Sequence, residues 1–500
     1  MSLMGIDVGT SGCKAVIFSP EGKILCSAYR EYSFLSPEAG WGQLESRGVW
    51  RKIKEAIKEA AAKCGETVSA LAVTSLGESM VPVTRNREIL GDSLLLFDPR
   101  GDEYLDELGS RIHDETLYRI TGNTLGSPYS LSKLMWIKEH WSEVYERADV
   151  FLFWSGFVAF MLGAEPAADY TLANRSLLFD IDETDWSNRL LAWSGLDREK
   201  LPKTVPSGTL IGRVSRQAAG ELGLPEGAAI CAGAHDQCAN ALGSGVTEEG
   251  DAMFGMGTYL CIVPVFSRRP EPAAMIERGL NTEHHARADR FVSFIYNQCG
   301  SVVKWYRDTF AAEEHRRAKA EGADVYDRLF AELPAQPSSV SVLPHFAFMG
   351  PPQFVSDASG VIAGLRLGTG RGDVLKGILE GSIFALKESV ATLPGAGINI
   401  DRYRAVGGGS RSEAWVRICA DILNCSFERT DVTEAGALGA SILAGTGMGV
   451  YASLGEGSEA TVRTRDCFEP DPDNVSLYED RYGEYLRLWS LLEDFLRGKQ

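Results

Sequence analysis

The chain has 500 residues, of which 44% are hydrophobic and 24% charged, and its formal net charge at pH 7 is −18. This length and apolar content suffice for two or three domains, each with its own core, and argue against disorder. The negative charge disfavours a nucleic-acid binder, because such proteins neutralise phosphates with lysine and arginine. The longest apolar stretches, such as 150–162, fall short of the ~20 residues that span a bilayer. We therefore expect neither nucleic acid nor membrane as a partner.

The N-terminus and the cysteines are typical of a cytoplasmic protein. The first residues lack the basic region, apolar core and cleavage site of a secretory signal. The ten cysteines form no C-x-x-C pair, and most lie in apolar runs, as reduced core thiols do. The adjacent pair His284–His285 lacks the spacing of a zinc site, so we expect no structural metal.

The first part of the chain alternates apolar runs with turns. The runs 3–8, 14–18 and 24–29 are separated by Gly-Thr-Ser-Gly and Pro-Glu-Gly-Lys, which predicts a three-stranded antiparallel meander. Apolar residues then recur at helical spacing over 49–61, and the run 68–73 is typical of a strand. Further along, the sequence predicts strands at 80–84 and 94–97 and helices at 131–147 and 157–162.

A second unit begins near the middle of the chain. The strand-like run 229–233 leads into Ala-His-Asp-Gln and a helical pattern over 237–242. The stretch 251–263 then repeats the opening pattern of strand, Gly-Thr turn and strand. We therefore predict two lobes, residues 1–245 and 246–500, with a ligand held between them. An amphipathic helix after Tyr478 ends the chain and packs on a lobe.

The turn Gly9-Thr10-Ser11-Gly12 is suited to binding phosphate. Its small residues let backbone N–H groups approach phosphate oxygens, the Thr10 and Ser11 hydroxyls add donors, and Lys14 adds a positive charge. A strand follows instead of a helix, so the turn is not a Walker P-loop. Asp7, just before it, would then orient a magnesium ion through water. The alternative is a plain hairpin with a solvated acid.

Two later segments complete the candidate site. Asp236 follows a strand, where α/β proteins bind ligands, and its carboxylate could take the proton of a hydroxyl that attacks a γ-phosphate; alternatively, it caps the next helix. Three glycines at 407–409 precede a helical pattern and would let a planar group lie against the backbone, or they form a tight structural turn. The glycines of 364–372 lack the G-x-G-x-x-G spacing of a dinucleotide site.

In order and spacing, these motifs resemble the FGGY family of carbohydrate kinases, within the fold shared by actin, hexokinase and heat-shock-chaperone ATPases. The resemblance runs nearly end to end. It is carried by Gly5-Ile6-Asp7-Val8-Gly9-Thr10-Ser11, Asp98-Pro99-Arg100, Lys133-Leu134-x-Trp136, Ala234-His235-Asp236-Gln237, Gly257-Thr258, Gly300 before Lys304-Trp305, Gly407-Gly408-Gly409-Ser410-Arg411-Ser412, and Glu434-Ala435-Gly436-Ala437-Leu438-Gly439-Ala440.

The resemblance implies an α/β fold of two ribonuclease-H-like lobes, with ATP and a polyhydroxylated substrate in the cleft between them. It implies that Asp236 is the general base and that Asp7 organises Mg²⁺. The phosphate path would be lined by Thr10, Ser11, Lys14, Gly257, Thr258 and Gly300, and the adenosine would face Gly408, Gly409 and Ser412. The substrate hydroxyls would meet Glu78, Asp98, Asp236 and Gln237.

The acceptor is less defined than the reaction. Where this chain has Leu-Gly-Glu-Ser at 76–79, xylulose kinases of the family usually carry Met-His and glycerol kinases Arg-Glu, of which only Glu78 is kept. A pocket rich in carboxylates should prefer neutral molecules with adjacent hydroxyls over sugar acids. We expect a ketopentose such as xylulose, with a glycerol- or erythritol-type polyol as the alternative.

Two other classes of protein share some of these features. A non-kinase ATPase of the same fold, a chaperone or cytoskeletal module, would lack a dedicated base, and Asp236-Gln237 argues against it. A sugar-sensing transcriptional regulator would need an added DNA-binding domain with a basic surface. The expected partner is a small sugar or polyol, and a homodimer is kept as the candidate assembly.

Overall fold

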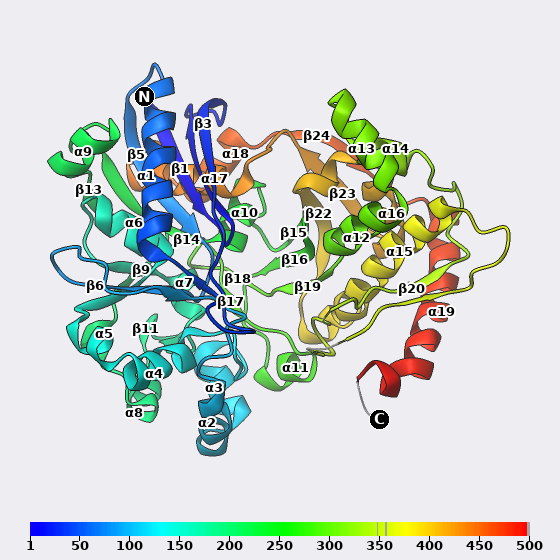
Figure 1. The fold of residues 1–500 in the computed structure, drawn as a ribbon, viewed down its shortest axis with the longest axis horizontal. Coiled ribbons are helices and arrows are strands. Elements are labelled where there is room, and N and C mark those ends of the chain that lie inside the picture. Colours follow the sequence, from blue (N-terminus) through cyan, green and yellow to red (C-terminus); the bar gives the residue numbers. More distant parts are fainter. Residues whose placement is uncertain (348, 356–357, 498–500) are drawn as a thin grey trace.

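The computed structural model describes residues 1–347, 349–355 and 358–497. Two mixed sheets dominate it, one in each half of Figure 1. In the first sheet the strand order is β13-β14-β5-β1-β2-β3, with β1 antiparallel to β2 and parallel to β5. Its strands are β1 Ser2–Val8, β2 Gly12–Phe18, β3 Ile24–Glu31, β5 Val68–Ser75, β13 Leu210–Arg213 and β14 Ala229–His235. The predicted meander, β1-β2-β3, is confirmed.

The second sheet repeats this arrangement. Its order is β17-β18-β16-β15-β22-β23-β24, and β19 also pairs with β16. As β1 does in the first sheet, β15 runs antiparallel to the next strand, β16, and parallel to β22. Its strands are β15 Gly250–Met256, β16 Tyr259–Phe266, β17 Glu283–His284, β18 Phe291–Val292, β19 Ile295–Gln298, β22 Ile400–Val406, β23 Ser426–Thr430 and β24 Thr464–Phe468. The predicted α/β fold of two related lobes is confirmed.

Shorter strands pair outside the two large sheets: β4 Gln43–Leu44 with β7 Ser93–Leu94, β6 Met80–Val83 with β8 Val150–Phe153, β9 Ala167–Asp169 with β12 Lys203–Val205, β10 Phe179–Asp180 with β11 Asp185–Trp186, and β20 Ser341–Leu343 with β21 Val361–Ala363. The predicted strand at 94–97 thus ends at Leu94, and Asp98 lies in a turn beyond it.

The helices that matter most for the site are α7 Tyr170–Asn174, α10 Asp236–Gly243, α12 Gly300–Phe310, α16 Glu413–Leu423 and α17 Ala435–Gly447. The others are α1 Ser46–Lys63, α2 Leu105–Arg111, α3 Asp114–Thr121, α4 Ser130–His140, α5 Ser142–Arg147, α6 Trp154–Leu162, α8 Asn188–Ser194, α9 Arg216–Leu222, α11 Pro272–Glu277, α13 Ala312–Glu321, α14 Val325–Phe330, α15 Arg371–Val390, α18 Leu454–Thr461 and α19 Pro472–Leu496. None of those in the described part of the chain is both long and apolar enough to cross a membrane.

Two helices differ most from their predicted bounds. The helix predicted at 131–147 is split into α4 and α5, because Trp141 leaves the helical conformation with φ −114° and ψ 47°. There its ring packs edge-on against Trp136 and lies over the guanidinium of Arg100. The terminal helix α19 begins earlier than predicted, at Pro472, where Asp471 caps it and proline suits the first helical position.

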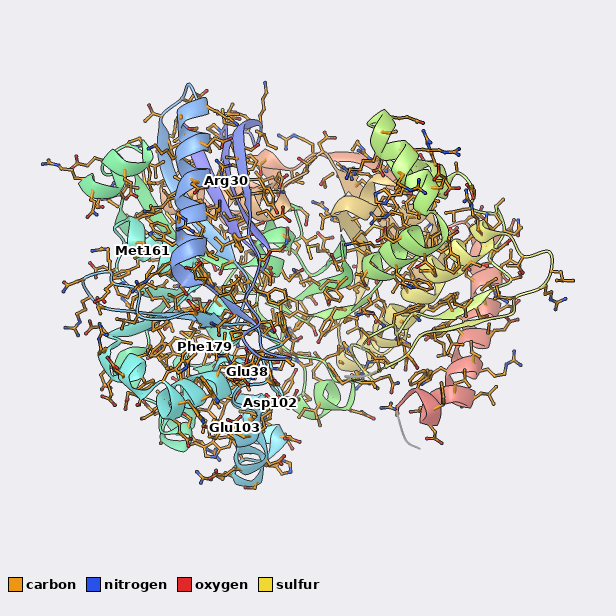
Figure 2. The ribbon with its side chains drawn as sticks, in the orientation of Figure 1. Arg30, Glu38, Asp102, Glu103, Met161 and Phe179 are labelled. Atoms are coloured by element: carbon orange, nitrogen blue, oxygen red, sulfur yellow. The ribbon has the colours of Figure 1, made fainter. Side chains whose placement is uncertain are left out.

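Alternate side chains of β1 lie on opposite faces of the first sheet. Met4 and Ile6 belong to the core under α1, and Leu3 belongs to the core under α17. On the α1 side, Arg30 of β3 lies beside the helix and pairs with Glu55 and Glu59 (Figure 2).

Helix α17 comes from the C-terminal half of the sequence but packs on the first sheet, so that in Figure 1 its orange ribbon lies among the blue strands. Glycines allow this approach. A Cβ on Gly5 of β1 would lie 1.8 Å from the carbonyl oxygen of Ala437, and one on Gly439 would lie 2.0 Å from that of Ala239 in α10. The start of α17 is thereby brought beside β1 and α10. The boundary between the two lobes at residue 245 stays a prediction.

Candidate active site

Asp236 is the first residue of α10, directly after the buried strand β14. One carboxylate oxygen, Oδ1, lies 3.2 Å from Nε2 of His235, and Gln237 donates a hydrogen bond to the carboxylate. Burial, with the nearby charges of Asp7 and Glu78, raises the pKa of Asp236 to about 7. The helix cap is His235 and no side-chain capping bond is formed, so Asp236 does not act as the N-cap. Its side chain is 29% exposed.

The first glycine turn joins β1 to β2. Its ends are fixed, because the Gly9 N–H donates to the Gly12 carbonyl at 2.9 Å and the Tyr32 hydroxyl contacts the carbonyl oxygens of both glycines. At the tip, Thr10 is half-buried and Ser11 is exposed. The turn is thus held rigidly while its hydroxyls remain accessible, as a phosphate site requires.

The second glycine turn joins β15 to β16 and adjoins the start of α12. The Gly257 N–H donates to the Tyr259 carbonyl at 3.1 Å, and the Ser301 N–H donates to the Thr258 carbonyl at 3.1 Å. A Cβ on Gly300 would lie only 2.2 Å from the Gly257 carbonyl oxygen. The structure therefore brings Gly257, Thr258 and Gly300 together at the second sheet, whereas Thr10 and Ser11 belong to the first sheet.

Asp7 and Lys14 lie on paired strands, and Lys14 has a partner that sequence reasoning missed. Its Nζ lies 2.7 Å from Oε2 of Glu434, the residue before α17. Burial raises the pKa of Asp7 to about 6, an effect that Lys14 opposes and Glu434 reinforces. Residues 1–347, 349–355 and 358–497 contain no cluster of three or more His, Cys, Asp or Glu that could hold a metal ion.

Glu78 is buried in an ion-pair network on the loop after β5. It has φ 59°, unusual for a residue with a side chain. Its Oε1 accepts a hydrogen bond from Arg175 Nε at 2.6 Å and a second from Nη2, while Arg175 Nη1 donates to Glu283 Oε1 at 2.6 Å. Glu283 lies on β17 of the second sheet, so Arg175 joins the two halves of the molecule beside Asp236.

Asp98 is fully buried, and both oxygens of its carboxylate are occupied. It accepts the Gly42 N–H at 2.7 Å and the backbone N–H and guanidinium of Arg100 at 2.6 to 2.9 Å. Burial acts to raise the pKa of Asp98, but these hydrogen bonds outweigh it and hold the pKa below its usual range. Asp98 thus joins its own loop to the segment at Gly42, and its contact with substrate stays a prediction.

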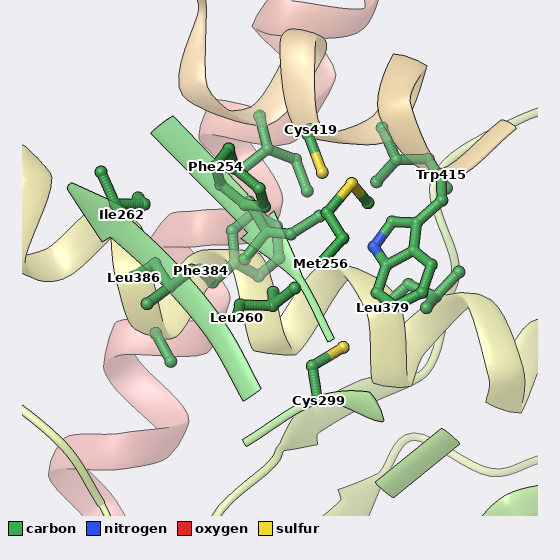
Figure 3. Packing of buried hydrophobic residues seen from close by; sticks show 14 of the residues in the cluster. Phe254, Met256, Leu260, Ile262, Cys299, Leu379, Phe384, Leu386, Trp415 and Cys419 are labelled. Atoms are coloured by element: carbon green, nitrogen blue, oxygen red, sulfur yellow. The ribbon is translucent and has the colours of Figure 1, made fainter. Parts of the chain in front are cut away.

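The predicted adenosine residues lie at the end of β22. A Cβ on Gly408 would meet nothing within 4 Å, whereas one on Gly409 would lie 2.7 Å from the Trp415 ring and 3.0 Å from the Met256 side chain. Met256 and Trp415 form part of the buried cluster in Figure 3. The Ser412 hydroxyl accepts a hydrogen bond from the backbone N–H of Trp415 and caps α16. The space beside Gly408 is therefore open, while Gly409 lies against the core.

Sequence reasoning missed four residues of this region, namely His235, Glu434, Arg175 and Glu283. His235 and Glu434 lie inside the motifs already recognised and could have been found as charged or polar neighbours of the site. Arg175 and Glu283 carry no local signal, since their partners lie about a hundred residues away in the sequence.

The chain matches one known protein family over most of its length. The family models for the N-terminal and C-terminal domains of the FGGY family of carbohydrate kinases match residues 2–243 and 264–448. The chain belongs to this family. It is thus a phosphotransferase of the carbohydrate kinase class, and FGGY kinases use ATP as the phosphoryl donor.

Relatives within the FGGY family differ in their named substrates. The chain is 24% identical to a xylulose kinase of Bacillus subtilis (strain 168), covering 98% of this chain and 97% of the relative. It is 29% identical to an autoinducer-2 kinase of Escherichia coli (strain K12), covering 96% and 92%. The crystal structure of a xylulose kinase from Rhodospirillum rubrum superposes with a TM-score of 0.87 at 25% identity, covering 99% of this chain and all of that one. These relatives therefore do not determine which acceptor this FGGY kinase phosphorylates.

Proposed function

We propose that this FGGY kinase transfers the γ-phosphate of ATP to a hydroxyl of a neutral ketose, with a ketopentose such as xylulose as the leading acceptor. The observation that carries the proposal is the setting of Asp236. It is a half-open carboxylate with a pKa near 7, at the end of β14 and close to the carboxylates of Asp7 and Glu78. A base with such a pKa can accept a proton at neutral pH and release it again.

In this proposal Asp236 takes the proton of the acceptor hydroxyl as its oxygen attacks the γ-phosphorus. A new P–O bond forms, the bond from the γ-phosphorus to the bridging oxygen breaks, and ADP leaves with that electron pair. The turns at Thr10–Ser11 and Gly257–Thr258 hold the phosphates from opposite sheets. Lys14, freed from Glu434, neutralises part of their charge.

The donor set fits magnesium as well as ATP. The Asp7 carboxylate is buried and its pKa is raised, so a cation beside it would relieve the cost of its charge. Mg²⁺ at nucleotides usually takes one or two carboxylates and keeps several waters. We propose that Asp7 holds it, with the ion supplying charge neutralisation at the phosphates. Gly408, with open space beside it, is the backbone position proposed to face adenosine.

Electrostatics favour a neutral acceptor. Glu78 and Glu283 share the single charge of Arg175, so this network with Asp236 has a net negative charge. A sugar acid would place another carboxylate against it. A second acceptor class, the ligand of autoinducer-2 kinases, is supported by the 29% identity to that relative.

The test is an ADP-coupled assay with D-xylulose, D-ribulose, erythritol, glycerol, autoinducer-2 and gluconate as acceptors. The proposal predicts the highest kcat/KM with a ketopentose and little turnover with gluconate. If gluconate is the best acceptor, the neutral-ketose assignment is wrong; if no acceptor stimulates ADP release, the kinase assignment itself fails.

A further inference from the structure

The guanidinium of Arg175 is held by two carboxylates and two aromatic rings. It donates to Glu78 through Nε, at 2.6 Å, and through Nη2, and it donates to Glu283 through Nη1 at 2.6 Å. Its central carbon lies 5.2 Å from the ring centroid of Tyr129 and 5.7 Å from that of Phe294, within the range of cation–π contacts. The guanidinium therefore has little freedom to turn.

The backbone before Arg175 is tied to the second sheet as well. Arg175 directly follows α7, whose last residue, Asn174, accepts the backbone N–H of His284 with its side-chain oxygen at 3.0 Å. His284 and Glu283 together form β17. At its other end, α7 is capped by the side chain of Asp169. Arg175 therefore extends from a short helix whose position is fixed by contacts with both halves of the molecule.

The hydrogen bonds from Arg175 distinguish the two oxygens of the Glu78 carboxylate. Two N–H groups converge on Oε1, whereas no hydrogen bond from residues 1–347, 349–355 or 358–497 reaches Oε2. Because the guanidinium is fixed, it also fixes the carboxylate, and Oε2 is the oxygen left to accept a hydrogen bond from a ligand hydroxyl. Burial, Asp7 and Glu78 together raise the pKa of Asp236, so Glu78 lies near the proposed base.

Resting on the proposed function, we propose that Arg175 is a positioning residue for the acceptor: by holding Oε1 of Glu78, it presents Oε2 to an acceptor hydroxyl. Glu283 holds the other side of the guanidinium, so the second half of the molecule takes part in shaping the acceptor site. Without the guanidinium, the Glu78 side chain would have to be ordered when the acceptor binds, and that ordering would weaken binding. The effect falls on acceptor affinity rather than on ATP.

The test measures acceptor KM and ATP KM for Arg175→Lys, Glu78→Gln and the double variant, with the best neutral acceptor of the panel above. Lysine keeps the positive charge, but an ammonium group cannot reproduce the planar fork of the guanidinium. Arg402→Lys is the matched control, because Arg402 also bridges two carboxylates, those of Asp251 and Glu428. Arg402 lies near the start of β22, whereas the predicted adenosine residues follow the end of this strand. Thermal midpoints are measured for all variants.

We expect Arg175→Lys to raise the acceptor KM roughly 10- to 100-fold, the scale of a hydrogen bond to a charged group. The ATP KM should stay within about 3-fold of that of the unchanged protein. Glu78→Gln should also raise the acceptor KM, and the double variant should be no worse than the poorer single variant, since Arg175 acts through Glu78. Arg402→Lys should leave both KM values unchanged.

The inference is overturned if Arg175→Lys keeps the acceptor KM of the unchanged protein, if the ATP KM rises in the same proportion, or if the losses from Arg175→Lys and Glu78→Gln add in the double variant. Should Arg175→Lys fail to fold, Glu283→Gln replaces it in the same cycle, because a neutral amide holds Nη1 less strongly than a carboxylate does. It should raise the acceptor KM without adding to Glu78→Gln; an absent or additive effect overturns the inference.

Failure of the proposed function is separate from failure of this inference. It is seen in the unchanged protein as absent turnover with every acceptor or as preference for gluconate, or as full turnover in Asp236→Asn.

Discussion

At the scale of single residues, the raised pKa of Asp236 predicts a conflict between function and stability. Between about pH 4 and 7 the folded state binds more protons at this residue than the unfolded state does, so ionisation costs stability as pH rises through that window. Asp236→Asn removes the cost. We expect it to be more stable than the unchanged protein by roughly 1–3 kcal/mol at pH 8, with the difference shrinking as pH falls and vanishing below about pH 4, as measured by urea unfolding.

Asp466 provides a control in which the expected change in stability has the opposite sign. Hydrogen bonds from Arg429 keep the pKa of Asp466 below its usual range, so Asp466→Asn should lower stability at pH 8 rather than raise it. If both variants change stability in the same direction, the interpretation of Asp236 is wrong.

Arg175 gives a second prediction at this scale. Arg175→Met leaves the carboxylates of Glu78 and Glu283 buried without their cation, which should cost about 3–5 kcal/mol in the free energy of unfolding. The exposed pair of Arg371 with Glu332 is the matched control, because Arg371→Met should cost at most ~1 kcal/mol. Equal losses in urea unfolding would contradict the special role of Arg175.

At the scale of secondary-structure elements, close packing of α10 on α17 positions Asp236. Gly439→Ala would place a methyl group 2.0 Å from the Ala239 carbonyl oxygen, so the helices must separate. We expect a loss of about 1–3 kcal/mol together with lower kcat. Gly483 in α19 has open space around it, and there Gly→Ala should raise stability by up to ~1 kcal/mol. A Gly439→Ala variant with unchanged stability and kcat would show that the close approach is not required.

The elements also show how far the sequence could be interpreted. Apolar runs bounded by turn residues predicted β1, β2 and β3, a further apolar run predicted β5, and the repeated strand, turn and strand predicted the second sheet, because these signals are local. The break at Trp141 was missed, since it depends on tertiary contacts with Trp136 and Arg100. The packing of α17 on the first sheet was missed for the same reason.

The same distinction between local signals and tertiary contacts applies to the residues of the candidate site. Asp236 and the two glycine turns could be recognised from spacing and chemistry. The partners of Glu78 and Lys14 could not, because Arg175 and Glu434 approach them only after folding. For Asp98, the sequence could not indicate that Gly42 and Arg100 hydrogen-bond to its carboxylate, and its contact with substrate stays a prediction.

At the scale of the whole molecule, the two glycine turns that we propose bind phosphate lie on separate sheets. If both bind one triphosphate, the halves must approach each other. Closure would also exclude water that could hydrolyse ATP. We expect the radius of gyration from small-angle scattering to fall when acceptor and a non-hydrolysable ATP analogue are both saturating. An unchanged radius of gyration would count against closure. The molecular mass from the same scattering data tests the candidate homodimer.

The central claim is that Asp236 is the base of an acceptor-dependent ATP kinase, and the most direct measurement is the acceptor-dependent kcat of Asp236→Asn. Asparagine keeps the shape of the side chain but cannot accept the proton. The account predicts a fall of roughly 10²-fold or more, with ATP binding retained. A kcat close to that of the unchanged protein would contradict it.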